Sequence, residues 1–127
     1  MRIGSLLENQ NFEKRIAITP EIVKKYISLG FEVCLSENYG SHLGIQDDQY
    51  KDVGVYISKD EIEVLNTSDI IVQVGMLSDK NISNVKENQS IIGVLNPYNN
   101  KDKLENLAKK KINIFSLELL PRITRAQ

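Results

Sequence analysis

The stretch Asp69-Ile70-Ile71-Val72-Gln73-Val74-Gly75 carries isoleucine or valine at four of its seven positions. A near-continuous β-branched run of this length is typical of a central parallel strand that is covered on both faces. The stretch therefore predicts the middle of a parallel sheet, with helices above and below it.

Strand-like and helix-like segments alternate along the rest of the chain. We expect further strands at 3–7, 31–35, 55–57, 90–95 and 112–117, and helices at 20–29, 47–53, 58–65, 79–87 and 101–110. This alternation predicts one α/β domain of three layers, Rossmann-like or flavodoxin-like, whose mostly parallel sheet has helices on both faces.

Local signals mark several helix ends. Thr19 before Pro20 is typical of a helix start, and Gly30 is expected to end that helix in a left-handed conformation. Ser58 with Glu61 three residues later predicts a capping box. In the helix at 101–110 we expect Leu104, Leu107 and Ala108 to face inward.

Composition narrows the class of protein. The 127 residues suit one domain, and 41% apolar with 26% charged residues is typical of a soluble globular protein. The formal charge of −1 recruits neither nucleic acid nor anionic lipid. Cys34 lies in an apolar run and is expected to be a buried thiol. No signal peptide or stretch of roughly 20 apolar residues is present, so we expect a cytosolic chain.

Familiar catalytic and nucleotide motifs are missing. The loop 39–44 has glycines four apart, and the chain contains no GxGxxG fingerprint. His42 is the single histidine, which leaves little material for a metal cluster or a catalytic triad. We therefore expect no metal site, and a surface role for His42 in its loop.

Two stretches could carry function. Arg15 precedes a helix start, where a cation can meet a ligand carboxylate, although pairing with Glu13 on the surface would equally explain it. The segment 118–127 follows a predicted strand, and open α/β sheets bind ligands past the carboxyl ends of their strands. From charge pattern alone a solvated terminus is an equal alternative.

The segment 121–127, PRITRAQ, resembles the motif PRI(S/T)RAQ of the NAD(H)-binding component of proton-translocating NAD(P) transhydrogenases. The resemblance implies that Arg122 and Gln127 contact the nicotinamide end of NAD(H). The segment 13–20 resembles ExRVAxTP, which opens both the transhydrogenases and alanine dehydrogenase. In alanine dehydrogenase the arginine that matches Arg15 holds the substrate carboxylate, so Arg15 becomes a candidate to line the cleft.

Further positions compare the two relatives. The segment 40–50 resembles the GAGxxAGFxDExY of both families but departs at the second glycine and the alanine. Alanine dehydrogenase has a lysine where Gln73 stands and a catalytic histidine where Asn96 stands. An amide neither carries a cation nor exchanges protons near neutral pH. The stretch 95–97 resembles the transhydrogenases, many of which nevertheless keep the lysine at position 73.

The resemblance implies that residues 1–127 are the single N-terminal domain of a larger alpha subunit, with the dinucleotide-binding domain expected after residue 127. Hydride would pass from NADH in the full subunit to NADP on a partner domain, coupled to proton translocation. The implied partners are the rest of the subunit, the NADP-binding and membrane-spanning components, and a second copy in a homodimer. The complex would hold the subunit at the cytoplasmic side of the inner membrane.

The catalytic role is left to the two cofactors, so no residue is assigned as catalytic. The isolated fragment is expected to be inactive and to bind no cofactor. Two alternatives stay open: an alanine or saccharopine-type dehydrogenase domain, and a non-catalytic binding module.

Overall fold

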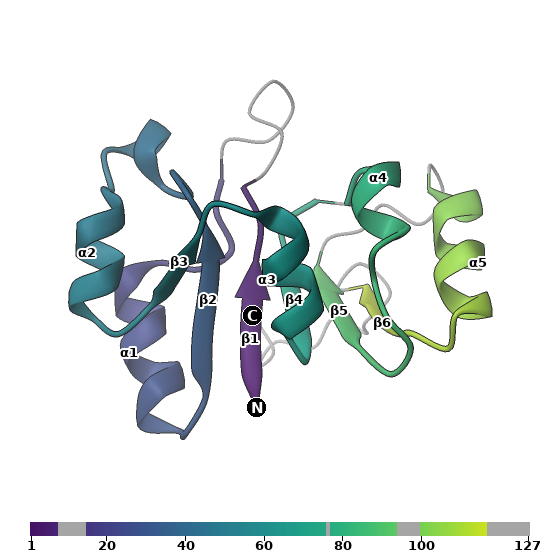
Figure 1. Ribbon diagram of the computed structural model, residues 1–127, viewed down its shortest axis with the longest axis horizontal. Coiled ribbons are helices and arrows are strands. Elements are labelled where there is room, and N and C mark those ends of the chain that lie inside the picture. Colours follow the sequence, from purple (N-terminus) through teal and green to yellow (C-terminus); the bar gives the residue numbers. More distant parts are fainter. Residues whose placement is uncertain (8–14, 76, 94–99, 117–127) are drawn as a thin grey trace, which may run out of the picture.

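The computed structural model describes residues 1–7, 15–75, 77–93 and 100–116, except the side chains of Asp79 and Ser116. Its sheet has six strands in the order β3-β2-β1-β4-β5-β6, and every pairing is parallel (Figure 1). The strands are β1 (Arg2–Ser5), β2 (Glu32–Ser36), β3 (Tyr56–Ser58), β4 (Ile70–Gln73), β5 (Ser90–Gly93) and β6 (Asn113–Ser116). The predicted central strand is β4, which pairs with β1 and β5.

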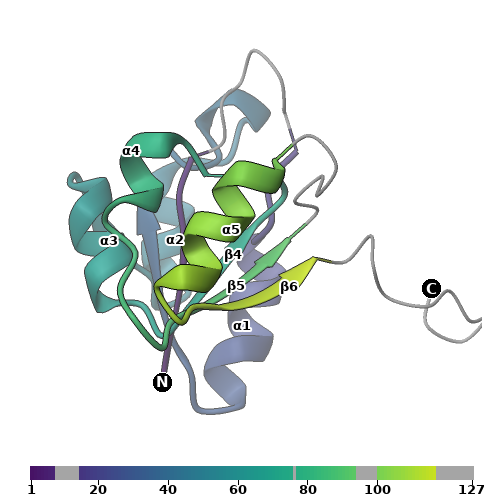
Figure 2. The same ribbon diagram turned by 90° about the vertical axis from the view of Figure 1, so that its right-hand side faces the viewer.

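Helices cover both faces of this sheet, as the sequence predicts. They are α1 (Pro20–Ser28), α2 (Asp47–Asp52), α3 (Glu61–Thr67), α4 (Asp79–Ile82) and α5 (Lys101–Lys109), with a 3-10 turn at Ser41–Leu43. Two separate apolar clusters lie beneath them. One contains side chains of α1 and α2, and the other contains side chains of α3, α4 and α5 (Figures 1 and 2).

Alternating side chains divide each strand between the two clusters. In β2, Val33 and Leu35 belong to the cluster under α1 and α2, and Cys34 between them belongs to the opposite cluster. Successive residues of a strand point to opposite faces, so both faces of β2 are buried. Cys34 is fully buried, as expected, and burial raises the pKa of its thiol.

The first helix begins and ends as its sequence indicates. The Ile22 amide donates to Thr19 Oγ1 over 3.4 Å, with Pro20 in the first turn. Gly30 has a φ of 93°, the left-handed conformation that favours glycine after a helix.

Three local predictions are wrong. Ser58 does not cap α3, because it ends β3; Asp60 is the cap, and its Oδ1 accepts the Ile62 amide over 2.9 Å. The helix expected at 79–87 ends at Ile82, and turns follow it. Ala108 is exposed, whereas Leu107 packs inward.

Close packing fixes β1 against α3. A Cβ on Gly4 would lie 1.9 Å from Ser68 Oγ, so only glycine fits here without a shift of the backbone. Ser68 is held in place because its hydroxyl donates to Val64 O over 2.6 Å. The tight approach sets the position of the next residues of β1, which lead to the carboxyl end of the strand.

The crossovers reverse direction between β1 and β4. From β1 the chain runs outward to β2 and β3, and from β4 it runs outward the other way to β5 and β6. A crevice forms beyond the carboxyl ends of the strands at such a switch point, and ligands of open α/β sheets bind there. The residues at this edge are therefore the candidate site.

Candidate functional site

Gln73 joins β4 to the segment that follows β1. Backbone pairing of these strands covers Ile3 with Ile70 and Gly4 with Ile71. Further along, the Leu6 amide donates to Gln73 Oε1 over 2.5 Å, and Gln73 Nε2 donates to Leu6 O over 3.1 Å. The side chain of Gln73 thus continues the ladder where the main chains no longer pair. Both Leu6 groups are satisfied in a buried place, and Gln73 itself is only 4% exposed.

Ser5, one residue earlier, extends the polar contacts across the same edge. Its Oγ donates to Val72 O over 2.5 Å and lies 3.1 Å from Gln73 Oε1. The Tyr39 hydroxyl lies 2.8 Å from the same Oγ. Ser5 is completely buried, so a polar cluster fills the switch point between β1 and β4.

Two tyrosines hold the segment that precedes α1. The amides of Ala17 and Ile18 donate to the Tyr39 hydroxyl over 3.1 and 3.3 Å. The Tyr50 hydroxyl donates to Ile18 O over 2.8 Å. Their rings meet edge to face with centroids 5.9 Å apart, and both are fully buried. Burial, with smaller contributions from Tyr39 and Asp47, raises the pKa of Tyr50, which therefore stays a neutral donor.

Arg15 is exposed and lies two residues before Ala17. Because Ala17 is tied through Tyr39 to Ser5, the backbone of Arg15 lies within about 7 Å of a group fixed at the carboxyl edge. The other two predicted site residues, Arg122 and Gln127, lie outside the described residues, as does Asn96. His42 is partly buried in its 3-10 turn.

The described part of this edge is polar and has no net charge among its buried groups. Ser5, Tyr39, Tyr50 and Gln73 provide hydroxyls and one amide, each with hydrogen-bond partners. Such a surface suits a neutral polar ligand group better than an isolated ion, because a buried charge needs an opposite charge or several donors. Among the described residues, no three His, Cys, Asp or Glu side chains gather closely enough to hold a metal ion.

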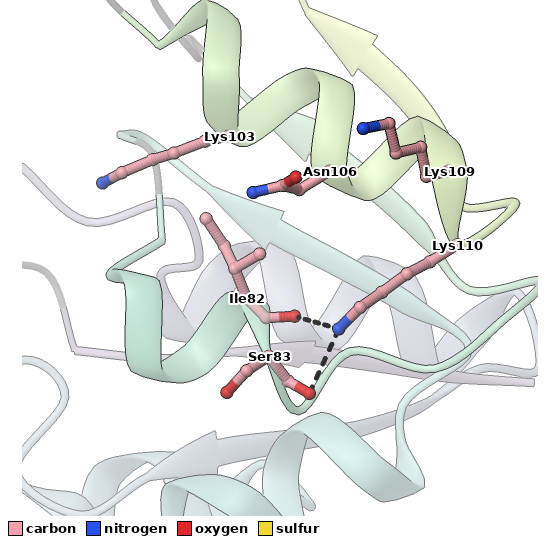
Figure 3. Close-up of a pocket in the computed structure, with 6 residues that line it drawn as sticks. All are labelled: Ile82, Ser83, Lys103, Asn106, Lys109 and Lys110. Atoms are coloured by element: carbon pink, nitrogen blue, oxygen red, sulfur yellow. Dashed lines mark hydrogen bonds between the residues drawn. The ribbon is translucent and has the colours of Figure 1, made fainter.

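A groove of about 470 Å³ separates α4 from α5 on one face of the sheet (Figure 3). Lys110 Nζ donates to the carbonyls of Ile82 and Ser83, both over 3.1 Å, and Lys103 Nζ donates to Leu77 O over 3.3 Å. These lysines of α5 and its C-cap therefore hold the two ends of the short α4. We interpret the groove as the packing boundary between the two helices.

A second hollow of about 340 Å³ opens at the amino edge of the sheet, beside Arg2 and Tyr56. The Arg2 guanidinium pairs with Glu32 over 3.2 Å and lies 5.9 Å from the centre of the Tyr56 ring. Its charge is thus already matched by side chains of this chain. The hollow lies at the end of the strands opposite the switch point.

The buried polar cluster was not predicted, although the sequence carries a signal for two of its members. Ser5 and Gln73 each interrupt an apolar run at the carboxyl end of a strand. A polar residue in such a place needs a partner once it is buried. Tyr39 carries no comparable signal, because it stands in a polar loop and its neighbours across the sheet come from folding alone.

The strand order, the parallel pairing and the polar crevice at the switch point define a Rossmann-like α/β domain. Residues 4–127 match the family described as Alanine dehydrogenase/PNT, N-terminal domain, and the chain belongs to this family. In Rickettsia prowazekii, the first of the separate chains that form the NAD(P) transhydrogenase alpha subunit is 36% identical over 131 residues. The alignment covers all of this chain and 34% of that relative.

Solved structures agree with the family. The crystal structure of transhydrogenase from Sinorhizobium meliloti superposes with a TM-score of 0.92 and 31% identity, over all of this chain and 38% of that chain. An L-alanine dehydrogenase reaches a TM-score of 0.84 at 19% identity, over 91% of this chain and 32% of that one, which shows a common fold. The chain spans about a third of the length of these relatives. No described helix has the length and apolar character that a membrane span requires.

Proposed function

We propose that this chain is the N-terminal domain of the alpha subunit of a proton-translocating NAD(P) transhydrogenase, where it forms one wall of the NAD(H) cleft. The observation that carries the proposal is the full-length likeness to the Sinorhizobium meliloti transhydrogenase, at a TM-score of 0.92. The motif at 121–127 supports it, because it follows the strand β6 and so begins at the carboxyl edge.

The described residues fit one end of a dinucleotide. Tyr39 and Gln73 are tied into a neutral polar cluster beside Arg15, and a nicotinamide carboxamide is a neutral group that needs a few directed hydrogen bonds. A pyrophosphate needs the amino end of a helix after a glycine-rich turn, and the sequence has no GxGxxG. The pyrophosphate would therefore rest on a separate domain, which we place after residue 127.

In this mechanism the protein binds and orients, and NAD(H) supplies the hydride chemistry when it is bound. Arg122 and Gln127 would hold the nicotinamide or its ribose, and Arg15 would line the same cleft. Each holds a ligand group in a fixed direction, and alignment of reacting groups accounts for a large part of enzymatic rate enhancement. The buried cluster under them keeps the wall rigid and excludes water from beneath the cleft.

The surroundings follow from the same proposal. NADP(H) would sit on a partner domain, and a membrane-spanning component would carry the protons. The subunit would be a homodimer on the cytoplasmic side of the inner membrane, attached through the complex.

Activity of the whole subunit with its partners tests the reaction. We expect NADH-dependent reduction of an NADP analogue and no alanine-dependent reduction of NAD. Gln73 is the structural basis for the second expectation, because its amide is engaged by Leu6 and offers no cation for a carboxylate substrate. Robust alanine oxidation would instead support an alanine dehydrogenase.

Cofactor binding to residues 1–127 tests the division of labour. Without a pyrophosphate site we expect this chain to bind NADH more weakly than about 1 mM, which corresponds to less than roughly 4 kcal/mol. Calorimetric titration measures this directly. A dissociation constant in the low micromolar range would contradict the placement of the dinucleotide site on another domain, and would favour a self-sufficient binding module.

A further inference from the structure

The Tyr39 hydroxyl is the point where three segments distant in sequence meet. It receives the amides of Ala17 and Ile18, and it contacts Ser5 Oγ over 2.8 Å. Tyr39 follows β2, Ser5 ends β1, and Ala17 precedes α1. The tyrosine therefore connects the segment of Arg15 to the strand at the switch point.

The direction of these hydrogen bonds follows from their donors. Two backbone N–H groups already donate to the phenol oxygen, so its own proton is directed to Ser5 Oγ. The Ser5 hydroxyl then donates to Val72 O over 2.5 Å. One continuous chain of hydrogen bonds thus runs from the segment before α1, through Tyr39 and Ser5, to the end of β4.

We propose that Tyr39 is a positioning residue that sets the place of Arg15 in the cleft. Arg15 itself is exposed, and the nearest anchored atoms along the chain after it are the Ala17 and Ile18 amides. Tyr50 holds the other side of the same peptide segment through Ile18 O. This inference rests on the proposed function, because the cleft is where Arg15 would meet the nicotinamide.

Replacement of Tyr39 by phenylalanine keeps the buried ring and removes the acceptor. The Ala17 and Ile18 amides then lose their partner, and the segment shifts or opens. Misplacement of a positioning group by about 1 Å costs up to about 100-fold in rate. We expect the hydride-transfer rate of the assembled enzyme to fall between about 10- and 100-fold in Tyr39→Phe, with a smaller change in the KM for NADH.

Two comparisons separate positioning from loss of stability. Ser68→Ala removes another buried hydroxyl, which donates to Val64 O in the opposite cluster, so it should reduce stability without changing the rate per folded enzyme. Combination of Tyr39→Phe with Arg15→Ala tests the route. If Tyr39 acts through Arg15, the double variant is no slower than Arg15→Ala alone.

Hydrogen exchange in the whole subunit gives a readout that needs no activity. We expect faster exchange at the Ala17 and Ile18 amides in Tyr39→Phe, and unchanged exchange there in Ser68→Ala. A wild-type complex that fails to transfer hydride overturns the proposed function, whatever the exchange result. Unchanged exchange in Tyr39→Phe, an unchanged rate, or multiplying effects in the double variant would each overturn the positioning role.

Discussion

Gln73 grips Leu6 through both ends of its carboxamide, with 2.5 Å from the Leu6 amide to Oε1 and 3.1 Å from Nε2 to Leu6 O. An amide side chain is the group that can imitate a neighbouring strand in this way, because it presents a donor and an acceptor side by side. A lysine, which many transhydrogenases have here, donates but cannot accept. The bridge therefore accounts for the amide at this position.

Gln73→Glu should destabilise the protein by about 2 kcal/mol at pH 7, because the carboxylate loses the donor to Leu6 O and faces that carbonyl as a buried charge. Gln49→Glu is the matched control. Gln49 is exposed and its Oε1 accepts the Gln46 amide, a role that a carboxylate retains. Urea denaturation of both variants measures the difference. Equal stabilities would show that the bridge contributes nothing.

Lys110→Met should lower stability by about 1 kcal/mol, because the ammonium of Lys110 satisfies two carbonyls at the end of α4. The neighbouring Lys109 is exposed, and Lys109→Met should stay within about 0.5 kcal/mol of the wild type. Thermal unfolding compares the two variants. A larger loss for Lys109→Met would contradict the role of the groove in holding α4 against α5.

Alkaline pH should weaken the fold. Burial raises the pKa of Cys34 above 9.0 and that of Tyr50 above 10.0, so both ionise more readily in the unfolded chain. Their contribution to stability is complete below about pH 9 and is lost as the pH rises further. The free energy of unfolding, measured from pH 7 to 10.5, should fall along this range. A double variant Cys34→Ala, Tyr50→Phe should show a shallower slope; an identical slope would exclude these two groups as the cause.

Arg122→Ala should leave the stability of this chain within about 0.5 kcal/mol of the wild type, because we place the side chain against ligand. In the assembled enzyme the same change should slow hydride transfer on the order of 100-fold. Lys109→Ala, an exposed cation on α5, serves as the control for loss of a surface charge. If Arg122→Ala unfolds the chain and the rate per folded enzyme is unchanged, Arg122 is structural.

The sequence by itself determined the class of fold. The apolar run of β4, the alternation of strands with helices, and the signals at Thr19 and Gly30 are local patterns, and each was confirmed. Local patterns suffice there because strand burial, helix capping and positive φ depend on a few adjacent residues. Ser58 shows their limit: the capping pattern was present, but pairing with β2 kept this residue in β3.

Only the tertiary structure decided what the polar residues of the edge do. Gln73 and Leu6 are 67 residues apart, and Tyr39 lies 22 residues beyond Ala17. Their hydrogen bonds exist because parallel crossovers bring the carboxyl ends of distant strands to one edge, which no local spacing encodes. Sequence motifs marked Arg15 as a candidate. Its attachment to β1 through the Tyr39 hydroxyl became visible only once the chain was folded, since that contact depends on three segments meeting at one buried oxygen.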